Sequence, residues 1–240
     1  LMAQHYTNWR LIALLDRDSG QNRDVIKHAV DGHSTIFVEC NYLKEGFPAM
    51  LNRALSISTA EYVARQDDDD LSTAGRFKSQ VKVLDSDESV VVVTGYGSVV
   101  SSTGTSLGTI MQPLDPRALA VELLKKNIIP HSSVMFRRND VVSYGSYDER
   151  LGGCEDYELW LRILEIGRIR SVGTTVVELL HHSGGMSRQA LPMRVVRQLN
   201  SRRIEACKRL GLSRREALRN SVMWSVGQIL APRVIRAVRQ

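Results

Sequence analysis

Four consecutive carboxylates, Asp67 to Asp70, follow a short apolar stretch at residues 62–64 (YVA). This arrangement predicts a short strand that ends in an acidic loop. In open α/β sheets, ligands collect at the carboxyl ends of the strands. Carboxylates crowded on one loop repel one another unless a cation compensates them, and Mg²⁺ or Mn²⁺ held by one or two carboxylates commonly binds a substrate's phosphates. The alternative is a solvated acidic turn.

The elements before the acidic run indicate how it is positioned. Residues 9–15 (WRLIALL) form an apolar run of strand length, followed by a polar loop that begins with Asp16. A short helix over 22–30, a strand over 35–39 and a helix over 48–58 come next. This β-α-β-α-β alternation predicts an α/β domain with a mostly parallel, Rossmann-like sheet flanked by helices.

The residues after the acidic run are expected to form further helices and strands, in alternation along the chain. We expect a helix over 72–84 with Ser72 as its N-cap, and a strand over 89–95, where β-branched residues are densest. The Gly/Ser/Thr-rich residues 96–113 suit a hairpin or a loop. Further expected elements are a helix over 118–126, a strand over 128–137, an amphipathic helix over 157–166 and a strand over 172–180.

The formal net charge of +6 is distributed unevenly. Residues 191–240 contain 12 Lys and Arg against 2 Asp and Glu, whereas residues 1–190 carry a net charge of −4. The apolar and basic residues of this tail predict an amphipathic helix on an anionic membrane surface. A helix packed on the rest of the chain is the alternative. Nucleic acid is not expected as a partner, because the tail has one aromatic residue, Trp224, and no recognition motif.

Composition also bounds the compartment. No apolar run approaches the roughly 18 residues of a membrane-spanning helix, and no signal peptide opens the chain. Cys40, Cys154 and Cys207 are too few and too widely spaced for a disulfide framework or a metal cluster. We therefore expect a cytoplasmic, reduced protein, with peripheral contact at the inner face of the membrane through the basic tail.

Six segments in a fixed order resemble motifs of the family 2 glycosyltransferases, inverting enzymes with the GT-A fold. The resemblance covers roughly residues 2–190. The segments are residues 4–16 (QHYTNWRLIALLD), Asn41 and Gly46 with 51–55 (LNRAL), 64–70 (ARQDDDD) followed by Ser72 and Arg76, 130–138 (PHSSVMFRR), 155–162 (EDYELWLR), and His182 with Ser187. Each segment alone is weakly specific, but together and in order they are a specific signature.

The resemblance implies a role for each matched residue. A divalent metal, Mn²⁺ or Mg²⁺, would be held by Asp67, Asp69 and His182, and would stabilise the negative charge of a leaving diphosphate. Asp156 would take the proton of the acceptor hydroxyl, with Glu155 beside it as a second catalytic residue. His131 and Trp160 would contact the acceptor. The nucleotide-sugar, which we interpret as a UDP-sugar, would be bound by Asp16, Asn41, Asn52, Arg65, Asp67 and Asp68.

Several of these residues also have a structural interpretation. Asp156 and Glu155 suit the first turn of a helix, where carboxylates favour the helix dipole. His131 and Trp160 suit a buried core. Arg65 could neutralise the acidic loop without contacting a ligand, and Asp70 is expected to orient that loop rather than to bind metal.

The chain departs from the family pattern at its start. The family's first strand, with the Pro-x-Tyr-Asn loop that cradles the nucleotide, is absent, and Leu15 replaces the first Asp of its Asp-Asp-Gly-Ser loop. We therefore expect an N-terminally truncated GT-A domain over residues 1–190 and a helical, Arg-rich extension over 191–240. Such a chain is either a fragment or a protein that binds nucleotide poorly.

The resemblance implies an inverting glycosyltransferase that moves a sugar from a nucleotide-diphosphate sugar to a glycan, lipid-linked or other hydroxyl acceptor in polysaccharide or cell-envelope assembly. One alternative is a degenerate glycosyltransferase-like binding module without activity, because the first strand is missing. Another is a nucleotidyl- or phosphoryltransferase, which can also use clustered Asp residues. That class normally carries a phosphate loop such as G-x-x-x-x-G-K-S/T, which the sequence lacks.

Overall fold

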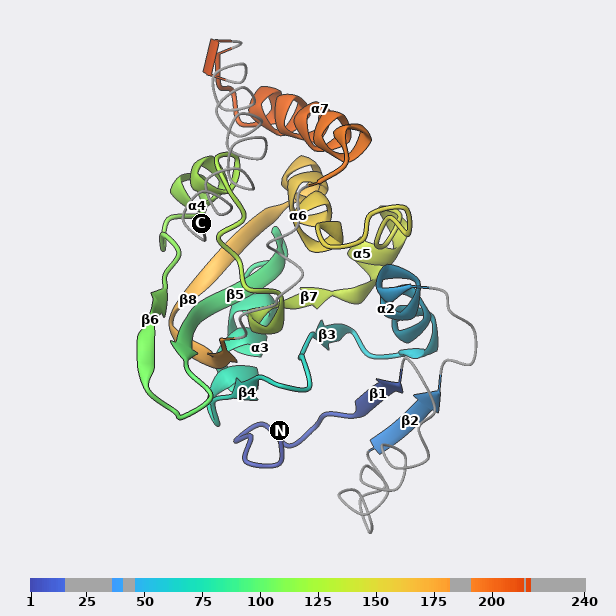
Figure 1. Ribbon diagram of the computed structural model, residues 1–240, viewed down its shortest axis with the longest axis vertical. Helices are drawn as coiled ribbons and strands as arrows, with labels where there is room; N and C mark the ends of the chain where they lie inside the picture. Colours follow the sequence, from blue (N-terminus) through green and yellow to red (C-terminus); the bar gives the residue numbers. More distant parts are fainter. Residues whose placement is uncertain (16–35, 41–45, 182–190, 214, 217–240) are drawn as a thin grey trace, which may run out of the picture.

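Figure 1 shows the computed structural model of the chain. It describes residues 1–15, 36–40, 46–181, 191–213 and 215–216. Three predicted site residues, Asp16, Asn41 and His182, lie outside these ranges, as do residues 217–240, the last part of the tail for which a membrane-bound helix is predicted. Within the described residues, no helix has both the length and the apolar character that crossing a bilayer requires.

The described strands form two sheets. β1 (Leu11–Leu15) pairs in parallel with β2 (Ile36–Cys40), as the alternation predicts. The larger sheet has the strand order β3-β7-β5-β8-β4, and β6 pairs with β5. Its members are β3 (Tyr62–Ala64), β4 (Leu71–Ser72), β5 (Val90–Val100), β6 (Ser106–Ile110), β7 (Met135–Arg137) and β8 (Arg168–Leu180).

The α/β class is confirmed, but the expectation of a mostly parallel sheet is wrong for the larger sheet. Only β5 and β8 are parallel there, and its other described pairs are antiparallel. A hairpin joins β5 to β6, and such short connections reverse the chain, whereas a parallel pair needs a long crossover. The sheet is therefore mixed.

Helices cover both faces of the larger sheet (Figure 1). α3 (Arg76–Ser86) contacts β5, β7 and β8, whereas α4 (Pro116–Leu123) contacts β8 and α6 (Glu155–Ile166) contacts β5 and β8. Val90 and Val93 of β5 belong to the core cluster that contains α3 residues, and Val91 belongs to the cluster that contains α4 and α6 residues. β5 is therefore buried on both faces, which explains its continuous apolar sequence.

The shorter elements include one correction to the prediction. α2 (Phe47–Ile57) matches the expected helix, and α5 (Arg138–Ser143) was not expected. Residues 128–137 do not form one strand; they contain a 3₁₀ turn, η1 (His131–Ser133), and the short β7. The expected N-cap Ser72 belongs instead to β4, and Gly75 precedes α3. The side chain of Ser72 contacts Arg76 instead of a backbone N–H of α3.

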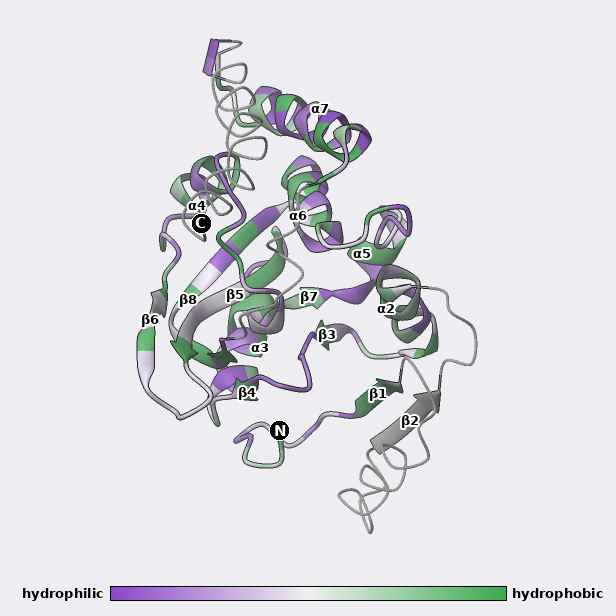
Figure 2. Cartoon of the chain, viewed as in Figure 1, coloured by the Kyte–Doolittle hydropathy of each residue, from purple (hydrophilic) through white to green (hydrophobic). Residues whose placement is uncertain are grey.

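α7 (Met193–Arg209) packs against α6, although it belongs to the expected C-terminal extension. Figure 2 shows alternating hydrophilic and hydrophobic residues along it, and Val195, Val196, Leu199, Ala206 and Cys207 join the same core cluster as α6. Arg202 pairs with Glu158 at 2.9 Å, and Glu158 also pairs with Arg162 at 2.8 Å. Arg202, a basic residue of the tail, therefore binds the rest of the chain.

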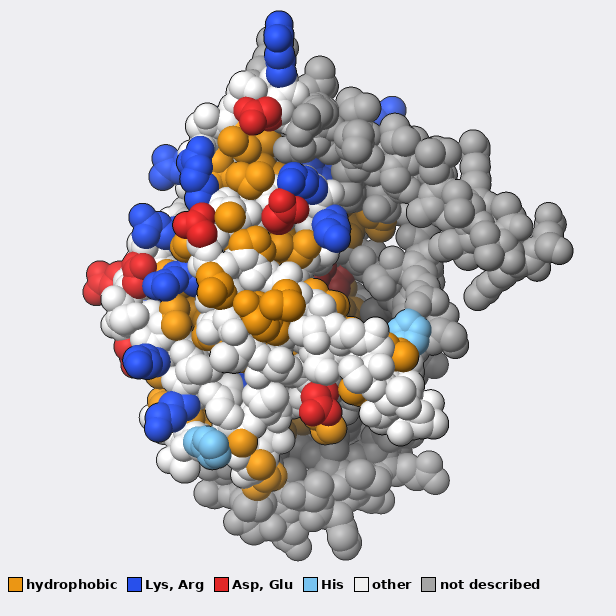
Figure 3. All heavy atoms as spheres, turned by 90° about the vertical axis from the view of Figure 1, so that its left-hand side faces the viewer, with side chains coloured by type: hydrophobic (Ala, Val, Ile, Leu, Met, Phe, Trp, Pro, Cys, Tyr) orange, Lys and Arg blue, Asp and Glu red, His pale blue; other side chains and the backbone are white. Residues whose placement is uncertain are grey.

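The sheet edge formed by β6 is exposed and uncharged. Figure 3 shows hydrophobic side chains gathered on the face where β6 and α4 lie. Residues 89–114 contain no charged side chain. The large apolar side chains exposed in this stretch are Leu107, Ile110, Met111 and Leu114.

Candidate active site

The guanidinium of buried Arg76 donates hydrogen bonds that fix the acidic loop between β3 and β4. Arg76 has 0% exposed surface, and its Nη2 donates to the carbonyls of Arg65 at 2.7 Å and Val134 at 2.9 Å. Its Nη1 donates to Gln66 Oε1 at 2.8 Å. Gln66 Nε2 in turn donates to the carbonyls of Asp67 at 3.0 Å and Asp70 at 2.7 Å. The loop's shape therefore depends on Arg76 and Gln66.

Three of the four carboxylates come together. One oxygen from each of Asp67, Asp69 and Asp70 lies within 4.8 Å of the others. Burial raises the pKa of Asp70, and the charges of Asp67 and Asp69 raise it further, while hydrogen bonds from Ser132 and from the Leu180 backbone oppose this shift. A cluster of half-exposed, mutually repelling carboxylate oxygens fits a hard divalent cation such as Mg²⁺ or Mn²⁺.

The cluster differs from the prediction in its membership. Asp70 was expected only to orient the loop; it does accept a hydrogen bond from Leu180 N at 3.1 Å, but it also belongs to the cluster. Asp68 is exposed and lies outside the cluster. The run of four Asp residues indicated an acidic site. Which three of the four carboxylates come together depends on the conformation of the turn that follows β3.

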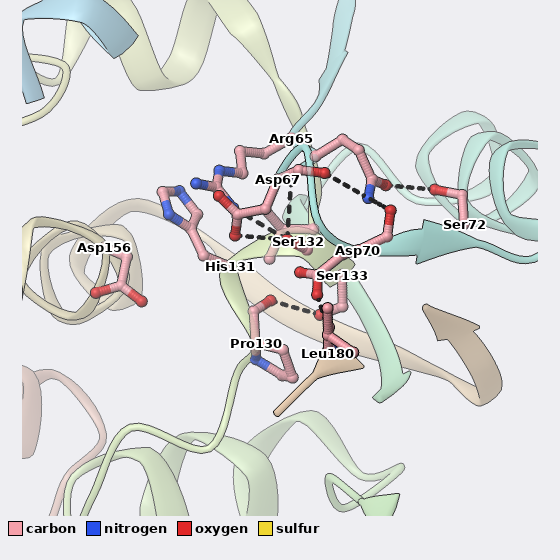
Figure 4. A network of polar contacts seen from close by, with 12 residues as sticks. Arg65, Asp67, Asp70, Ser72, Pro130, His131, Ser132, Ser133, Asp156 and Leu180 are labelled. Carbon is pink, nitrogen blue, oxygen red and sulfur yellow. Dashed lines mark hydrogen bonds and ion pairs between the residues drawn. The ribbon is translucent and has the colours of Figure 1, made fainter. Parts of the chain in front are cut away.

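Ser132 and Arg65 orient Asp67 (Figure 4). Ser132 Oγ donates to Asp67 Oδ2 at 2.8 Å and accepts from Asp67 N at 3.1 Å and from Arg65 Nη1 at 3.0 Å. Arg65, 8% exposed, forms an ion pair with Asp67. Through this ion pair, Arg65 offsets part of the negative charge of the cluster, which agrees with the structural interpretation of this residue.

Asp156 and Glu155 lie in the first turn of α6, as expected. Asp156 is partly buried, and its Oδ2 accepts from Asn127 Nδ2 at 2.9 Å while its Oδ1 accepts from Tyr157 N at 2.6 Å. Burial, followed by the nearby Glu155 charge, raises the pKa of Asp156 to about 6. Glu155 is 4% exposed, and its Oε2 has no hydrogen-bond partner. A carboxylate with a pKa near neutrality is suited to proton transfer.

His131 lies between the acidic loop and Asp156 in Figure 4. Its Nε2 shares a hydrogen bond of 2.9 Å with Tyr147 Oη, and its ring meets Trp160 edge-on at a centroid distance of 5.9 Å. Burial, together with the positive charge of Arg65, holds the pKa of His131 well below its usual value. His131 is therefore a neutral imidazole at physiological pH.

Two predicted ligand contacts are corrected by the structure. Trp160 has 0% exposed surface, so its ring packs in the core and cannot stack on an acceptor. Asn52 was expected to bind the nucleotide-sugar. Its Nδ2 donates to Tyr147 O at 2.9 Å and Glu149 Oε1 at 2.8 Å, and its Oδ1 accepts from Tyr147 N at 2.9 Å. The Asn52 amide therefore joins α2 to the loop before α6, and both of its N–H donors are engaged within the chain rather than by a ligand.

Sequence reasoning missed three contacts of the site: Ser132 with Asp67, Asn127 with Asp156, and Tyr147 with His131. Ser132 lies inside the 130–138 motif (PHSSVMFRR), so the sequence alone could have indicated it as a site residue. Asn127 and Tyr147 carried no signal, because each reaches its partner from a different segment of the chain.

Comparison with known proteins gives consistent matches. Residues 1–191 match the family model described as Glycosyl transferase family 2. The chain is 31% identical over 170 residues to EpsE of Bacillus subtilis, a protein named as a glycosyltransferase, covering 70% of this chain and 60% of that protein. It is 34% identical over 122 residues to the amylovoran biosynthesis glycosyltransferase AmsE of Erwinia amylovora, covering 51% and 45%. The chain thus spans about half of the length of these curated relatives.

Solved structures share the fold. S. aureus TarS 1-349 superposes with a TM-score of 0.68 at 12% identity, covering 95% of this chain and 65% of that one. GalNAc-T7 with UDP, GalNAc and Mn²⁺ gives 0.60 at 13% identity, covering 81% and 41%. At these identities the likeness concerns the fold alone, and it confirms the expected GT-A architecture. With four-fifths of its length matched by the family model, the chain belongs to glycosyl transferase family 2.

Proposed function

We propose that the protein transfers a sugar from a nucleoside-diphosphate sugar, a UDP-sugar, to a hydroxyl group of a glycan or lipid-linked acceptor, with inversion at the sugar carbon. One observation carries the proposal. A three-carboxylate cluster lies on one side of His131 and a carboxylate of raised pKa lies on the other, and membership of a glycosyl transferase family supports sugar transfer as the reaction.

The donor side is supported by the chemistry of the cluster. Asp67, Asp69 and Asp70 would hold Mn²⁺ or Mg²⁺, which when bound supplies positive charge to the diphosphate that departs. The fold neighbours include TarS in complex with UDP and GalNAc-T7 with UDP and Mn²⁺. Asp68, exposed beside the cluster, remains a candidate for contact with the nucleotide, and the predicted roles of Asp16, Asn41 and His182 lie outside the described residues.

The acceptor side is supported by Asp156. Its carboxylate would take the proton of the acceptor hydroxyl as the oxygen bonds to the anomeric carbon and the bond to the diphosphate oxygen breaks on the opposite face. Glu155 is 4% exposed, and after burial its charge is the next largest cause that raises the pKa of Asp156, so its role would be to tune the base. His131, a neutral donor or acceptor beside Asp156, would contact the acceptor.

The nature of the acceptor is supported by the relatives. AmsE is named for amylovoran biosynthesis, and a further match is named as an O-antigen biosynthesis glycosyltransferase, WbnJ, of Escherichia coli. We infer a polysaccharide or its lipid-linked precursor as acceptor. Contact with the inner membrane face through residues 217–240 remains a prediction.

Isothermal titration of UDP and GDP, with and without Mn²⁺, tests the donor side. We expect UDP to bind only with Mn²⁺, and Asp69→Ala to weaken that binding at least ~10-fold, because it removes one ligand of the metal. Asp68→Ala should retain the metal dependence, since its side chain lies outside the cluster.

Glu88→Ala, an exposed carboxylate away from the loop, is the control for loss of one negative charge. Equal weakening by Asp69→Ala and Glu88→Ala would show that only net charge matters. Wild-type protein that binds neither nucleotide would favour the binding-module interpretation.

A further inference from the structure

Asn127 follows α4, and its side chain reaches the first turn of α6. Its Nδ2 donates to Asp156 Oδ2 at 2.9 Å, and its Oδ1 accepts from Ile129 N at 3.2 Å. The contact with Ile129 determines which end of the amide faces the carboxylate, because only the carbonyl oxygen can accept from an N–H. With Tyr157 N on the other oxygen, both oxygens of Asp156 are held and its carboxylate plane is fixed.

The same stretch of chain ends at the acidic cluster. Ser132, five residues after Asn127, holds Asp67 through two hydrogen bonds. Six residues span at most about 20 Å when fully extended, so the 127–132 segment limits the separation of Asp156 and Asp67. One segment therefore contacts both the proposed base and a proposed metal ligand.

The 127–132 segment is fixed between its two ends. Ile128 and Ile129 are buried, and the Ile128 carbonyl accepts from Gln112 Nε2 at 2.9 Å. Gln112 is itself only 3% exposed. Pro130 restricts the backbone, and its carbonyl accepts from Ser133 Oγ at 2.7 Å. A rigid segment with contacts at both ends fixes the distance between them.

We propose that Asn127 is a positioning residue for Asp156, presented by a rigid segment whose far end, Ser132, holds Asp67. The proposal rests on the proposed function, because it takes Asp156 as the base. Asn127 would hold the Asp156 carboxylate in the orientation that the acceptor hydroxyl requires, at a fixed separation from the donor side. A base must lie within hydrogen-bond reach of the proton it removes, so its orientation affects the rate directly.

The groups around Asp156 determine the sign of the expected change. Burial and then the charge of Glu155 raise its pKa, whereas the amide of Asn127, the Tyr157 N–H and the charge of Arg65 lower it. Among the described residues, Tyr147, Tyr157 and Cys154 also interact with Asp156, and burial raises the pKa of each, so they stay neutral at neutral pH. Burial lowers the pKa of His131, which lies beside Asp156, so it is neutral as well. Removing the Asn127 amide therefore moves the pKa of Asp156 upward.

Two variants and one control test the proposal in the full chain. Asn127→Ala removes the donor, and Asn127→Asp replaces it with a second carboxylate of similar shape. Lys126→Ala changes the exposed neighbouring residue. Because Asn127 is also exposed, all three variants should fold, which circular dichroism and thermal melting would check.

The first readout is the titration of the Asp156 carboxyl carbon, followed by ¹³C NMR and assigned by its absence in Asp156→Asn. We expect Asn127→Ala to shift this titration to higher pH, and Asn127→Asp to shift it further, because two adjacent carboxylates share one proton. The second readout is the pH dependence of kcat/KM. We expect about a fivefold loss at pH 7 for Asn127→Ala, a larger loss for Asn127→Asp, and partial recovery of both at higher pH.

A titration and a pH profile that match Lys126→Ala in both variants would overturn the proposal. So would a rate loss that is the same at every pH, since that indicates only a structural role. The NMR titration needs no turnover. It therefore tests the contact of Asn127 with Asp156 separately from the proposed sugar transfer. If the Asn127 variants shift the titration in a chain that transfers no sugar, the placement of Asn127 stands and the proposed function fails.

Discussion

Asp156→Asn is expected to lower kcat by about 10³-fold while leaving the Kd for UDP with Mn²⁺ within about twofold. The amide keeps the shape of the side chain but cannot accept the proton of an acceptor hydroxyl. Asp156 is not a member of the carboxylate cluster, so donor binding should persist. Transfer is measured as UDP release from the matching nucleotide-sugar, and binding by the titration described above.

The pH dependence of the wild-type enzyme follows from the same residue. The base must be ionised to act, and its pKa is raised to about 6, so kcat/KM should rise as the pH increases through that value. Asp156→Asn should lose this limb of the profile.

The same variant is expected to have a stability at pH 7 close to that of the wild type, because the loss of one accepted hydrogen bond offsets the removal of a carboxylate whose pKa is raised. The folded chain holds the Asp156 proton to a higher pH than the unfolded chain does, so the free energy of unfolding falls as the pH rises from the ordinary Asp range to about 6. The amide removes this unfavourable contribution. A variant that loses activity only because it unfolds, or one as active as the control Glu88→Gln, would contradict the role of Asp156 as base.

Arg76→Met is expected to reduce the free energy of unfolding by about 2 to 6 kcal/mol, because two buried carbonyls lose their donors and each unsatisfied group costs about 1 to 3 kcal/mol. Arg76 has no exposed surface, and without it the carbonyls of Arg65 and Val134 lose buried donors. Since Gln66 also loses its contact, Mn²⁺-dependent UDP binding should weaken as well. Urea unfolding and calorimetric titration measure the two effects.

Lys78→Met, an exposed position on the same helix, is the control, and we expect it to change stability by less than about 0.5 kcal/mol. Similar stabilities for the two variants would show that the loop does not depend on Arg76. A loss of stability with intact nucleotide binding would show that the loop keeps its shape by other contacts.

Much of the fold could be predicted from local patterns. The apolar runs before Asp16 and before the acidic loop are strands, as predicted. The run of Val residues in β5 was recognisable as a strand because β5 is buried on both faces. The direction of the strands could not be read in this way. Neighbours in the larger sheet, such as β3 and β7, are distant in sequence, so their antiparallel pairing depends on tertiary packing. The strand expected over residues 128–137 failed because Pro130 and the hydrogen bonds of Ser133 favour a turn there.

Some residues of the candidate site could be predicted from the sequence, and others could not. Asp67, Asp69 and Asp156 could be chosen because each belongs to a short, recognisable segment. Trp160 and Asn52 were misplaced because the sequence motif shows which residues recur and not which way their side chains face. Burial directs Trp160 into the core, and Asn52 is occupied by the backbone of Tyr147. Asn127 was missed because its partner lies 29 residues away, with no periodicity to connect them.

The packing of α7 on α6 also has a consequence for how the protein is made. Tyr157, next to the proposed base, receives hydrogen bonds from the buried Arg203, and Glu158 pairs with Arg202. On a ribosome adding roughly 5 to 20 residues per second, the last residue of α7 follows the end of α6 by about 2 to 9 s. Throughout that interval the side of α6 that packs against α7 is uncovered, and exposed apolar surface favours aggregation. A chain released before α7 is synthesised would carry every carboxylate of the site and still be prone to aggregate.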